Sequence, residues 1–350
     1  MDKIAVNASR PYTVVIEDGL LGSVGSLIRD ELGGSRAMVV TDDTVSFLYL
    51  DKVMSSLRES GYEAFSFVLA SGEASKNTDN YIRLMTALCD CGLERSDVVI
   101  ALGGGVVGDI AGFAASTWMR GTRYVNVPTT LLAAVDSSIG GKTAVDLPVG
   151  KNLIGSFWNP SLVIIDPMTL RTLSPETFLD GYAESIKYGI LTDPHMMTVL
   201  RTADESRDYN ELIGRAIRVK VQIVEKDESD HGMRQYLNFG HLLGHAVEAC
   251  SDFKISHGSA VALGLALESK GCALSGLTDI SVHHEITKIL EEFHFDLTTD
   301  FTRDDLMPFI RHDKRIRDEH IRLIVPEQIG KCGMRDISIE DMPQFVTLCL

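Results

Sequence analysis

The sequence predicts two domains, an α/β domain over residues 1–170 and an all-helical domain over residues 171–350. Up to Pro167, short runs of β-branched residues alternate with helical patterns, an order typical of a largely parallel, Rossmann-like sheet covered by helices. After Pro167, long helical patterns dominate. The length of 350 residues fits this division, because single domains usually contain about 100–200 residues.

Each element follows from the hydrophobic period and from the turn residues around it. In the first domain, runs rich in Val and Ile predict strands at 12–16, 37–41, 64–69, 97–102, 123–127 and 162–165, and helical periodicity predicts helices at about 44–60, 77–91 and 106–117. In the second domain, the same criteria predict helices at about 175–191, 209–229, 235–250, 257–275, 281–293 and 303–312, and one strand at 321–325.

The charge balance excludes several classes of protein. With 33 basic and 49 acidic residues the formal net charge is −16, whereas binding to nucleic acid or to a membrane surface needs a basic footprint. No apolar run reaches the roughly 18–20 residues of a membrane span, and the N-terminus is too polar for a signal peptide. We therefore expect a cytoplasmic protein without nucleic-acid or membrane partners, whose six cysteines are reduced.

A glycine-rich segment follows the strand predicted at 97–102. Residues 103–109, Gly-Gly-Gly-Val-Val-Gly-Asp, have the form G-x-G-x-x-G between a strand and a helix, where backbone amides can bind a pyrophosphate. The acidic residue expected about 20 residues later is missing, but Asp42 and Asp43 after an earlier strand are alternative ligands for a ribose. A tight turn that needs glycine for steric reasons explains the same pattern, so both interpretations stay open.

Two further glycine-rich segments carry basic residues. Residues 136–143, Asp-Ser-Ser-Ile-Gly-Gly-Lys-Thr, resemble a P-loop, but Asp136 stands where that motif requires its first glycine, which argues against ATP hydrolysis. Lys142, Lys151 and Asn152 are suited to bind an anionic oxygen group. Solvated lysines on surface loops are the alternative.

Three histidines and one acid in the second domain suggest a metal site. His241 and His245 are four residues apart and share a helix face, and His257 opens the next predicted helix. A zinc protease is excluded because Leu242 occupies the position of its general base. Glu184, with Lys187 three residues on, can add a carboxylate, and two imidazoles with one carboxylate leave metal positions open for catalysis. Taken singly, each is more often an ordinary core or surface residue.

Together these motifs resemble the 3-dehydroquinate synthase family of sugar phosphate cyclases, from residue 42 to about residue 315. The resemblance implies a dehydroquinate synthase-like fold with an NAD-binding α/β domain, a helical metal-binding domain, bound NAD and Zn²⁺ or Co²⁺, and a homodimer. The matching motifs occur in the family's order: Gly-Glu-x-x-Lys at 72–76, 103–109, Met-Arg-Gly at 119–121, Pro-Thr-Thr-Leu-Leu at 128–132, 136–143, 150–155, Ala-Glu-x-Ile-Lys at 183–187, Lys220 with Asp-Glu at 227–228, 234–241, Gly-His-Ala at 244–246 and His-Gly at 257–258.

The resemblance also implies roles for individual residues. The implied metal ligands are Glu184, His241 and His257. The implied NAD-binding residues are Asp42, Glu73, Lys76, Gly104, Gly105, Val106, Asp109, Thr129, Thr130, Lys142, Lys151 and Thr172. The implied catalytic and substrate-binding residues are Asp136, Lys142, Asn152, Lys187, Lys220, Arg234, Asn238, His245 and Lys314, with Arg120 reaching into the site of the neighbouring subunit.

The implied activity is that of a phosphorus–oxygen lyase of the shikimate pathway, which serves aromatic amino acid biosynthesis. It would convert 3-deoxy-D-arabino-heptulosonate 7-phosphate to 3-dehydroquinate and phosphate by transient NAD-dependent oxidation, phosphate elimination, reduction, ring opening and intramolecular aldol closure. Departures from the family pattern, such as Leu242 and Ser259, leave another sugar phosphate cyclase as an alternative. A metal-dependent NAD polyol dehydrogenase is a weaker alternative, because its substrates are neutral and would not need the basic residues. A catalytically silent NAD-binding regulator is a further alternative, but it predicts that some of the metal ligands or lysines are replaced.

Overall fold

The computed structural model describes residues 1–313 and 315–350, which form two compact units. Residues 1–173 and 220–228 make up the first unit, and residues 174–219 and 229–350 make up the second. The sequence predicts a single boundary near residue 170, and the structure differs from this prediction in one respect. The segment 220–228 lies in the second half of the chain but packs with the first unit.

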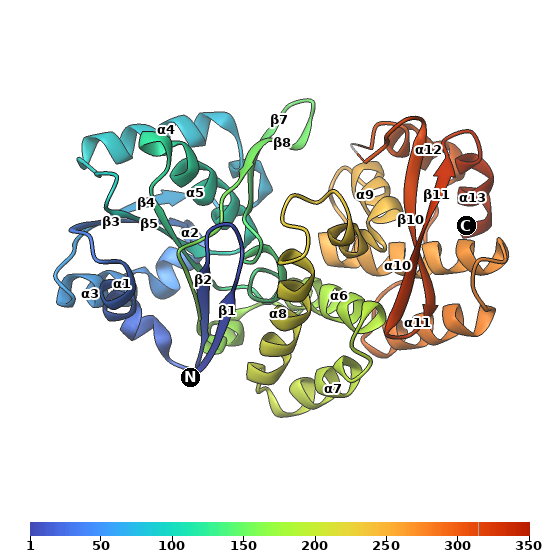
Figure 1. Cartoon of the computed structure of the whole chain (residues 1–350), viewed down its shortest axis with the longest axis horizontal. Helices are drawn as coiled ribbons and strands as arrows, with labels where there is room; N and C mark the ends of the chain where they lie inside the picture. The colour runs from blue at the N-terminus through green and yellow to red at the C-terminus, as the bar shows by residue number, and fades with distance from the viewer. Residues whose placement is uncertain (314) are drawn as a thin grey trace. The chain divides into compact units, whose positions relative to one another are not determined.

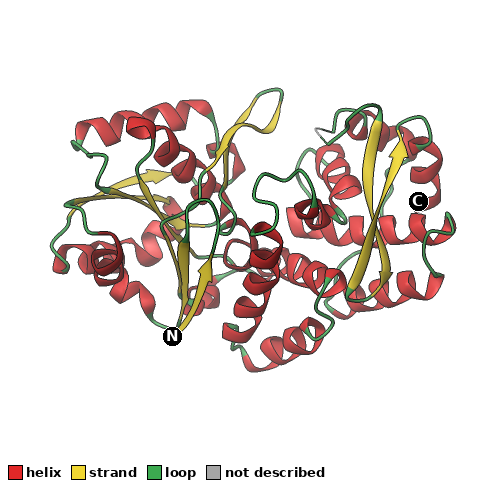
Figure 2. Ribbon diagram, in the orientation of Figure 1, coloured by secondary structure: helices red, strands yellow, loops and turns green. Residues whose placement is uncertain are grey.

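A seven-stranded sheet forms the centre of the first unit (Figures 1 and 2). Its order is β1-β2-β9-β6-β5-β3-β4, with only β1 and β2 antiparallel, so the predicted largely parallel sheet is confirmed. All six predicted strands are present within one residue at each end. The strands are β1 (Asp2–Val6), β2 (Tyr12–Ile16), β3 (Arg36–Asp42), β4 (Glu63–Leu69), β5 (Val98–Gly103), β6 (Arg123–Pro128) and β9 (Leu162–Ile165).

Helices cover both faces of this sheet, as Figure 1 shows. Alternate side chains of a strand enter different cores, because successive residues point to opposite faces. Val39 and Ile100 pack with α1 and α3, whereas Val40 and Ala101 pack with α4 and α5. The helices are α1 (Val24–Leu32), α2 (Asp43–Val45), α3 (Asp51–Glu59), α4 (Thr78–Asp90) and α5 (Gly105–Thr117).

An antiparallel hairpin of β7 (Lys142–Leu147) and β8 (Gly150–Phe157) also belongs to the first unit. The sequence predicts glycine-rich turns in this region, because glycine, lysine and asparagine interrupt the alternation that identifies a strand. Asp146 at the end of β7 donates its backbone N–H to the carbonyl of Lys76 at 2.8 Å, which ties the hairpin to the start of α4. The hairpin therefore has a fixed base.

The second unit is mainly helical, as predicted, but it also contains a two-stranded sheet. Its antiparallel hairpin of β10 (His320–Gln328) and β11 (Lys331–Ser338) packs Ile321, Leu323 and Val325 into the helical core. Among the described residues, no helix is both long enough and apolar enough to cross a membrane. The helices are α6 (Pro175–Leu191), α7 (Met196–Ser206), α8 (Asn210–Val224, of which residues 220–224 belong to the first unit), α9 (His241–Cys250), α10 (His257–Leu274), α11 (Ile280–Glu292), α12 (Arg303–Ile310) and α13 (Met342–Cys349).

The helix predicted at 235–250 is broken in the structure. Residues 233–238 form a 3-10 turn, and α9 begins only at His241. Gly240 stands between them with φ of 77°, a left-handed conformation that interrupts an α-helix and suits glycine. This break places His241 in the first turn of its helix.

We expect Gly25→Ala to destabilise the first unit. A Cβ on Gly25 of α1 would lie 2.1 Å from the carbonyl oxygen of Ser56 in α3, so the two helices must separate. The free energy of unfolding should fall by about 1–3 kcal/mol, the usual cost of overpacking. Gly22→Ala is the matched control, because its Cβ would meet only Lys52 Cε at 3.4 Å. Equal urea denaturation midpoints for both variants would contradict this account of the packing.

Candidate functional site

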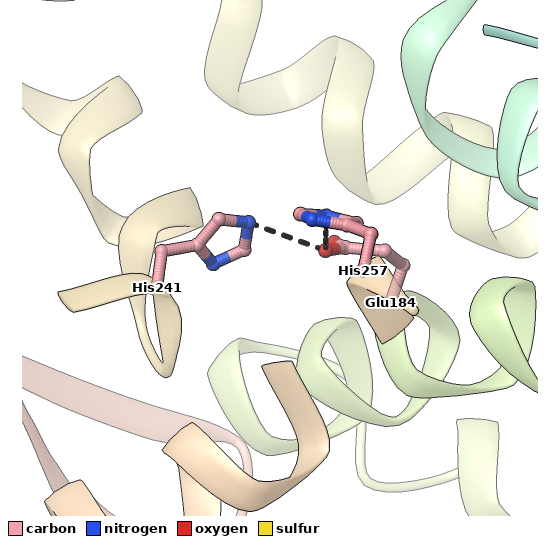
Figure 3. A group of neighbouring side chains, drawn as sticks. All are labelled: Glu184, His241 and His257. Atoms are coloured by element: carbon pink, nitrogen blue, oxygen red, sulfur yellow. Dashed lines mark ion pairs between the residues drawn. The ribbon is translucent and has the colours of Figure 1, made fainter. Parts of the chain in front are cut away.

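Three side chains from three helices of the second unit meet at one point (Figure 3). Glu184 comes from α6, whereas His241 and His257 are the first residues of α9 and α10. The Nε2 atoms of His241 and His257 lie 3.3 Å and 3.5 Å from Oε1 of Glu184. Residues distant in sequence are thus brought together as the sequence analysis required of a metal site.

The spacing of these donors fits a divalent metal ion. Bonds of about 2.0–2.2 Å at tetrahedral angles separate neighbouring ligand atoms by about 3.3–3.6 Å. Glu184 is fully buried, and neither carboxylate oxygen has a hydrogen-bond partner of normal geometry. Burial raises the pKa of Glu184, but Lys187 and His241 outweigh this effect and hold the pKa well below its usual value, so the carboxylate is ionised. One carboxylate and two imidazoles suit Zn²⁺ or Co²⁺.

Neighbouring oxygen atoms orient both histidines. Nδ1 of His241 lies 3.1 Å from the carbonyl oxygen of Phe239, and Nδ1 of His257 lies 3.4 Å from Oε2 of Glu248. When Nδ1 carries a proton toward oxygen, Nε2 keeps its lone pair for a metal. Burial lowers the pKa of His257, but hydrogen bonds to Glu184 and Glu248 outweigh this and raise it to about 10. A metal would therefore displace a proton from His257.

Glu248 is a residue that the sequence analysis missed. The signal was present, because positions 241, 245 and 248 recur at helical spacing and share one face of α9. His245, Glu248 and His257 also place three ligand atoms within 4.8 Å of one another. This second group shares His257 with the first, so the two groups form one continuous cluster.

Other predicted substrate residues of the second unit border this cluster. Lys187 is buried, forms an ion pair with Glu184, and donates to the carbonyl oxygen of Leu237 at 2.8 Å. That contact links α6 to the 3-10 turn that carries Arg234 and Asn238. The ring centroid of His245 lies 5.2 Å from that of His241. The predicted substrate residue Lys314 lies outside the described residues.

Within the first unit, the structure joins Lys220 to Asp136, two predicted substrate residues 84 positions apart. Nζ of Lys220 lies 2.7 Å from Oδ1 of Asp136 and also donates to the Asp136 backbone carbonyl. Lys142 begins β7 and is exposed. Asn152 has φ of 57° and donates its backbone N–H to Oδ1 of Asp146 at 2.7 Å. A non-glycine residue in this conformation costs about 1–3 kcal/mol and is often found at functional sites.

The glycine segment forms a sharp turn from β5 into α5. Gly104 is the N-cap residue of α5 and supplies no side chain to the helix start, where Gly105 and Val106 follow. Free amides and the positive end of the helix favour an anion there. Thr129 lies beside the turn, bonded through its N–H to the carbonyl of Gly103 at 3.0 Å, and its buried hydroxyl has no partner among the described residues.

The buried Lys76 forms ion pairs with other predicted NAD-binding residues. Nζ of Lys76 lies 2.8 Å from Glu73 and 3.1 Å from Asp109, and Lys151 lies 3.8 Å from the same Glu73 oxygen. Burial lowers the pKa of Lys76, but Asp109 and Glu73 outweigh this and raise it, so the lysine stays charged. Thr130 lies beside Gly104.

Two predicted NAD-binding residues have structural contacts of their own. The side chain of Asp42 caps α2 by accepting from the Val45 amide at 2.9 Å. The hydroxyl of Thr172 lies 2.7 Å from that of Tyr49, on the segment before α3. These contacts fix both side chains in the absence of a ligand.

Solved structures share this fold over nearly the whole chain. A 2-deoxy-scyllo-inosose synthase, solved with carbaglucose-6-phosphate, NAD⁺ and Co²⁺, has a TM-score of 0.86 at 22% identity and covers 99% of both chains. The 2-epi-5-epi-valiolone synthase ValA from Streptomyces hygroscopicus, solved with NAD⁺ and Zn²⁺, has a TM-score of 0.86 at 26% identity, covering 97% of this chain and 96% of that one. An NADH-dependent butanol dehydrogenase from Thermotoga maritima has a TM-score of 0.72 at 14% identity, covering 96% of each.

Sequence comparison gives the family directly. The profile of the 3-dehydroquinate synthase N-terminal region matches residues 66–180, and that of the C-terminal region matches residues 181–316. The 3-dehydroquinate synthase of Streptococcus mutans is 40% identical over 359 aligned positions, covering 98% of this chain and 99% of that protein. The chain therefore belongs to the 3-dehydroquinate synthase family, and the resemblance and fold class predicted from the sequence are confirmed.

We expect Glu184→Gln to abolish Co²⁺ binding. Changes to residues that only orient metal ligands cost about 10–100-fold in affinity, so loss of a direct ligand should exceed about 100-fold. Calorimetric titration of metal-free protein with Co²⁺ measures this. Wild type should also gain about 2.7 kcal/mol of stability at a Co²⁺ concentration of 100 Kd, and the variant should gain none.

The matched control is Glu292→Gln, which removes a surface carboxylate paired with Arg201. This variant should bind Co²⁺ as wild type does. Undiminished binding by Glu184→Gln would show that the carboxylate is no ligand.

Proposed function

We propose that this chain catalyses the 3-dehydroquinate synthase reaction, which converts 3-deoxy-D-arabino-heptulosonate 7-phosphate to 3-dehydroquinate and phosphate. The convergence of Glu184, His241 and His257 carries the proposal, because it forms a candidate metal site within a chain that matches curated 3-dehydroquinate synthases along its length. The implied place of the reaction is the shikimate pathway in the cytoplasm.

The proposed cofactors are NAD and Zn²⁺ or Co²⁺, as in the two solved cyclases described above. When bound, they would supply a reversible hydride acceptor and a Lewis acid for the substrate hydroxyls. We assign NAD to the first unit, where the uncapped start of α5 suits a pyrophosphate. We assign the metal to the second unit, at the Glu184 cluster.

The remaining site residues would bind the two anionic ends of the substrate. Lys142, Asn152 and His245, with Arg120 of a second subunit, are assigned to the phosphate, and Lys220, Arg234 and Asn238 to the carboxylate. Lys187 would stabilise negative charge that develops on a substrate oxygen, because its buried ammonium is held in place by Leu237 and Glu184. Asp136 would keep Lys220 oriented through their 2.7 Å ion pair.

The surface of the first unit supports a homodimer. Large apolar side chains are exposed on the β7–β8 hairpin and on the turn after α5, and exposed apolar surface of this kind is typical of interaction surfaces. Ser156 of β8 bonds to Ser116 of α5 at 2.8 Å, so the hairpin and this turn are neighbours. Arg120 lies in the same turn, is exposed, and has φ of 64°, a strained conformation for a residue other than glycine. The exposed apolar residues are Met119, Val149, Leu153, Ile154 and Phe157.

One assay separates this proposal from its alternatives. The protein is supplied with the heptulosonate phosphate, trace NAD⁺ and Co²⁺, and phosphate and nicotinamide absorbance are followed together. We expect stoichiometric phosphate without accumulated NADH, because the hydride returns to the substrate. Conversion of the supplied NAD⁺ to NADH without phosphate release would instead identify a polyol dehydrogenase, and turnover only with another sugar phosphate would identify a different cyclase. His241→Ala should lose Co²⁺ and turnover together; full activity in that variant would refute the ligand assignment.

Subunit mixing tests the role of Arg120 across the interface. Arg120→Ala and His241→Ala should each be inactive alone. After subunit exchange at equal concentration, half of the dimers contain one of each chain, and one of their two sites is intact, so about a quarter of wild-type activity should return. Absence of recovery, despite mixed dimers seen by native mass spectrometry, would place Arg120 in the site of its own subunit.

A further inference from the structure

Glu268 is a buried carboxylate beneath the first turn of α9, and the sequence analysis did not single it out. It lies on α10 and accepts hydrogen bonds from the backbone N–H groups of Gly240, Leu242 and Leu243 at 3.0, 2.9 and 3.0 Å. The first amides of a helix have no acceptor within the helix. Since Gly240 provides no side-chain cap, Glu268 takes over that function from a neighbouring helix.

Close backbone packing holds Glu268 in this position. A Cβ on Gly264 of α10 would lie 1.9 Å from the carbonyl oxygen of Gly240, and a Cβ on Gly244 of α9 would lie 2.9 Å from the carbonyl oxygen of Ala260. The two helices therefore touch through glycine. Glu268 lies one turn beyond Gly264 on the same side of α10, where its side chain reaches the start of α9.

The capped amides flank a candidate metal ligand. His241 stands directly between Gly240 and Leu242, so contacts on both sides fix its backbone. The start of a helix also carries a positive partial charge of about half a unit, which opposes a divalent cation. In its ionised form, Glu268 offsets that charge. Burial outweighs the opposing effect of the three N–H donors and Arg315 and raises the pKa of Glu268 to about 7.

The start of α10 is arranged in the same way. Asp180 of α6 accepts the backbone N–H of Gly258 at 2.8 Å, one residue after the ligand His257. Each candidate histidine ligand thus opens a helix whose first turn is held by a carboxylate from another helix. This arrangement fixes the two imidazoles through backbone contacts as well as through their own rings.

We propose that Glu268 is a positioning residue for the metal site: it fixes the start of α9, and with it Nε2 of His241, and it offsets the positive end of that helix. The inference rests on the metal binding proposed above. It assigns Glu268 no contact with metal or substrate. Its effect should appear in metal affinity and in metal geometry rather than in folding alone.

The test compares Co²⁺ binding by wild type and Glu268→Gln. Glutamine has nearly the same shape, but it is neutral and turns one donor group toward the amides. We expect Co²⁺ affinity to fall about 10–100-fold, as for other residues that orient metal ligands, and the visible absorption bands of bound Co²⁺ to shift. Metal-free Glu268→Gln should still unfold cooperatively. Glu268→Asp, which keeps the charge but withdraws it by one methylene, should bind with intermediate affinity.

Asp279→Asn is the matched control. Asp279 caps α11 by accepting the Ser281 N–H at 2.8 Å, and α11 carries none of the candidate ligands. This variant should lose stability without a change in Co²⁺ affinity or spectrum. The same loss of Co²⁺ affinity in Asp279→Asn would show that Glu268 affects binding only through the general stability of the protein, and it would overturn the inference.

Two outcomes distinguish this inference from the proposed function. Wild-type affinity and spectrum in folded Glu268→Gln would overturn the positioning role and leave the metal site intact. A wild type that binds no Co²⁺ would overturn both. If Glu268→Gln does not fold, amide hydrogen exchange in metal-free wild type replaces the test. Slow exchange of the Leu242 and Leu243 amides would support their hydrogen bonds to Glu268, and exchange at the rate of an unfolded chain would refute them.

Discussion

The buried carboxylate of Glu184 is the group on which the arrangement of the second unit depends. An ionised acid removed from water is costly unless charged or hydrogen-bonding partners surround it. Here the partners are Lys187 on the same helix and two imidazoles from α9 and α10. Three helices must therefore meet at this point for the charge to be tolerated, and the same convergence produces a set of donors for a cation. Folding of the second unit and assembly of the candidate metal site therefore depend on the same three helices.

The two units balance charge in opposite ways. In the second unit a buried anion, Glu184, is surrounded by cationic and imidazole groups. In the first unit a buried cation, Lys76, is surrounded by Glu73, Asp109 and Asp146. Both clusters fix loops or helix ends that carry predicted ligand-binding residues. The acidic surplus of the chain is thus no guide to the local charge at either site.

Hydrophobic periodicity predicts much of the fold because the central strands are buried on both faces. β5 is an unbroken apolar run, and its prediction was accurate to one residue. The same logic failed for β8, whose residues are largely exposed and include glycine, and for α7 and α13, for which no helix was predicted. The break before α9 depends on the left-handed conformation of Gly240, and helical spacing alone does not reveal it.

The sequence predicts the candidate metal ligands but not the residues that hold these ligands in place. Glu184, His241 and His257 can be named from the sequence, because each stands in a family motif and the order of the motifs along the chain can be recognised without a structure. Glu248 and Glu268 act through contacts with a ring nitrogen or with backbone amides, and such contacts depend on how helices pack. A carboxylate on a mostly apolar helix, such as Glu268 on α10, is the remaining signal in the sequence, since a charge in that setting needs a specific partner.

The path of the chain between the two units determines how the protein would respond to cleavage. The segment 220–228 returns to the first unit, where Glu225 binds Asn7 and Glu228 binds Ser9 and Asn159. A protease cut after residue 173 would therefore leave two fragments still held together, and residues 1–173 expressed alone would lack part of the first unit.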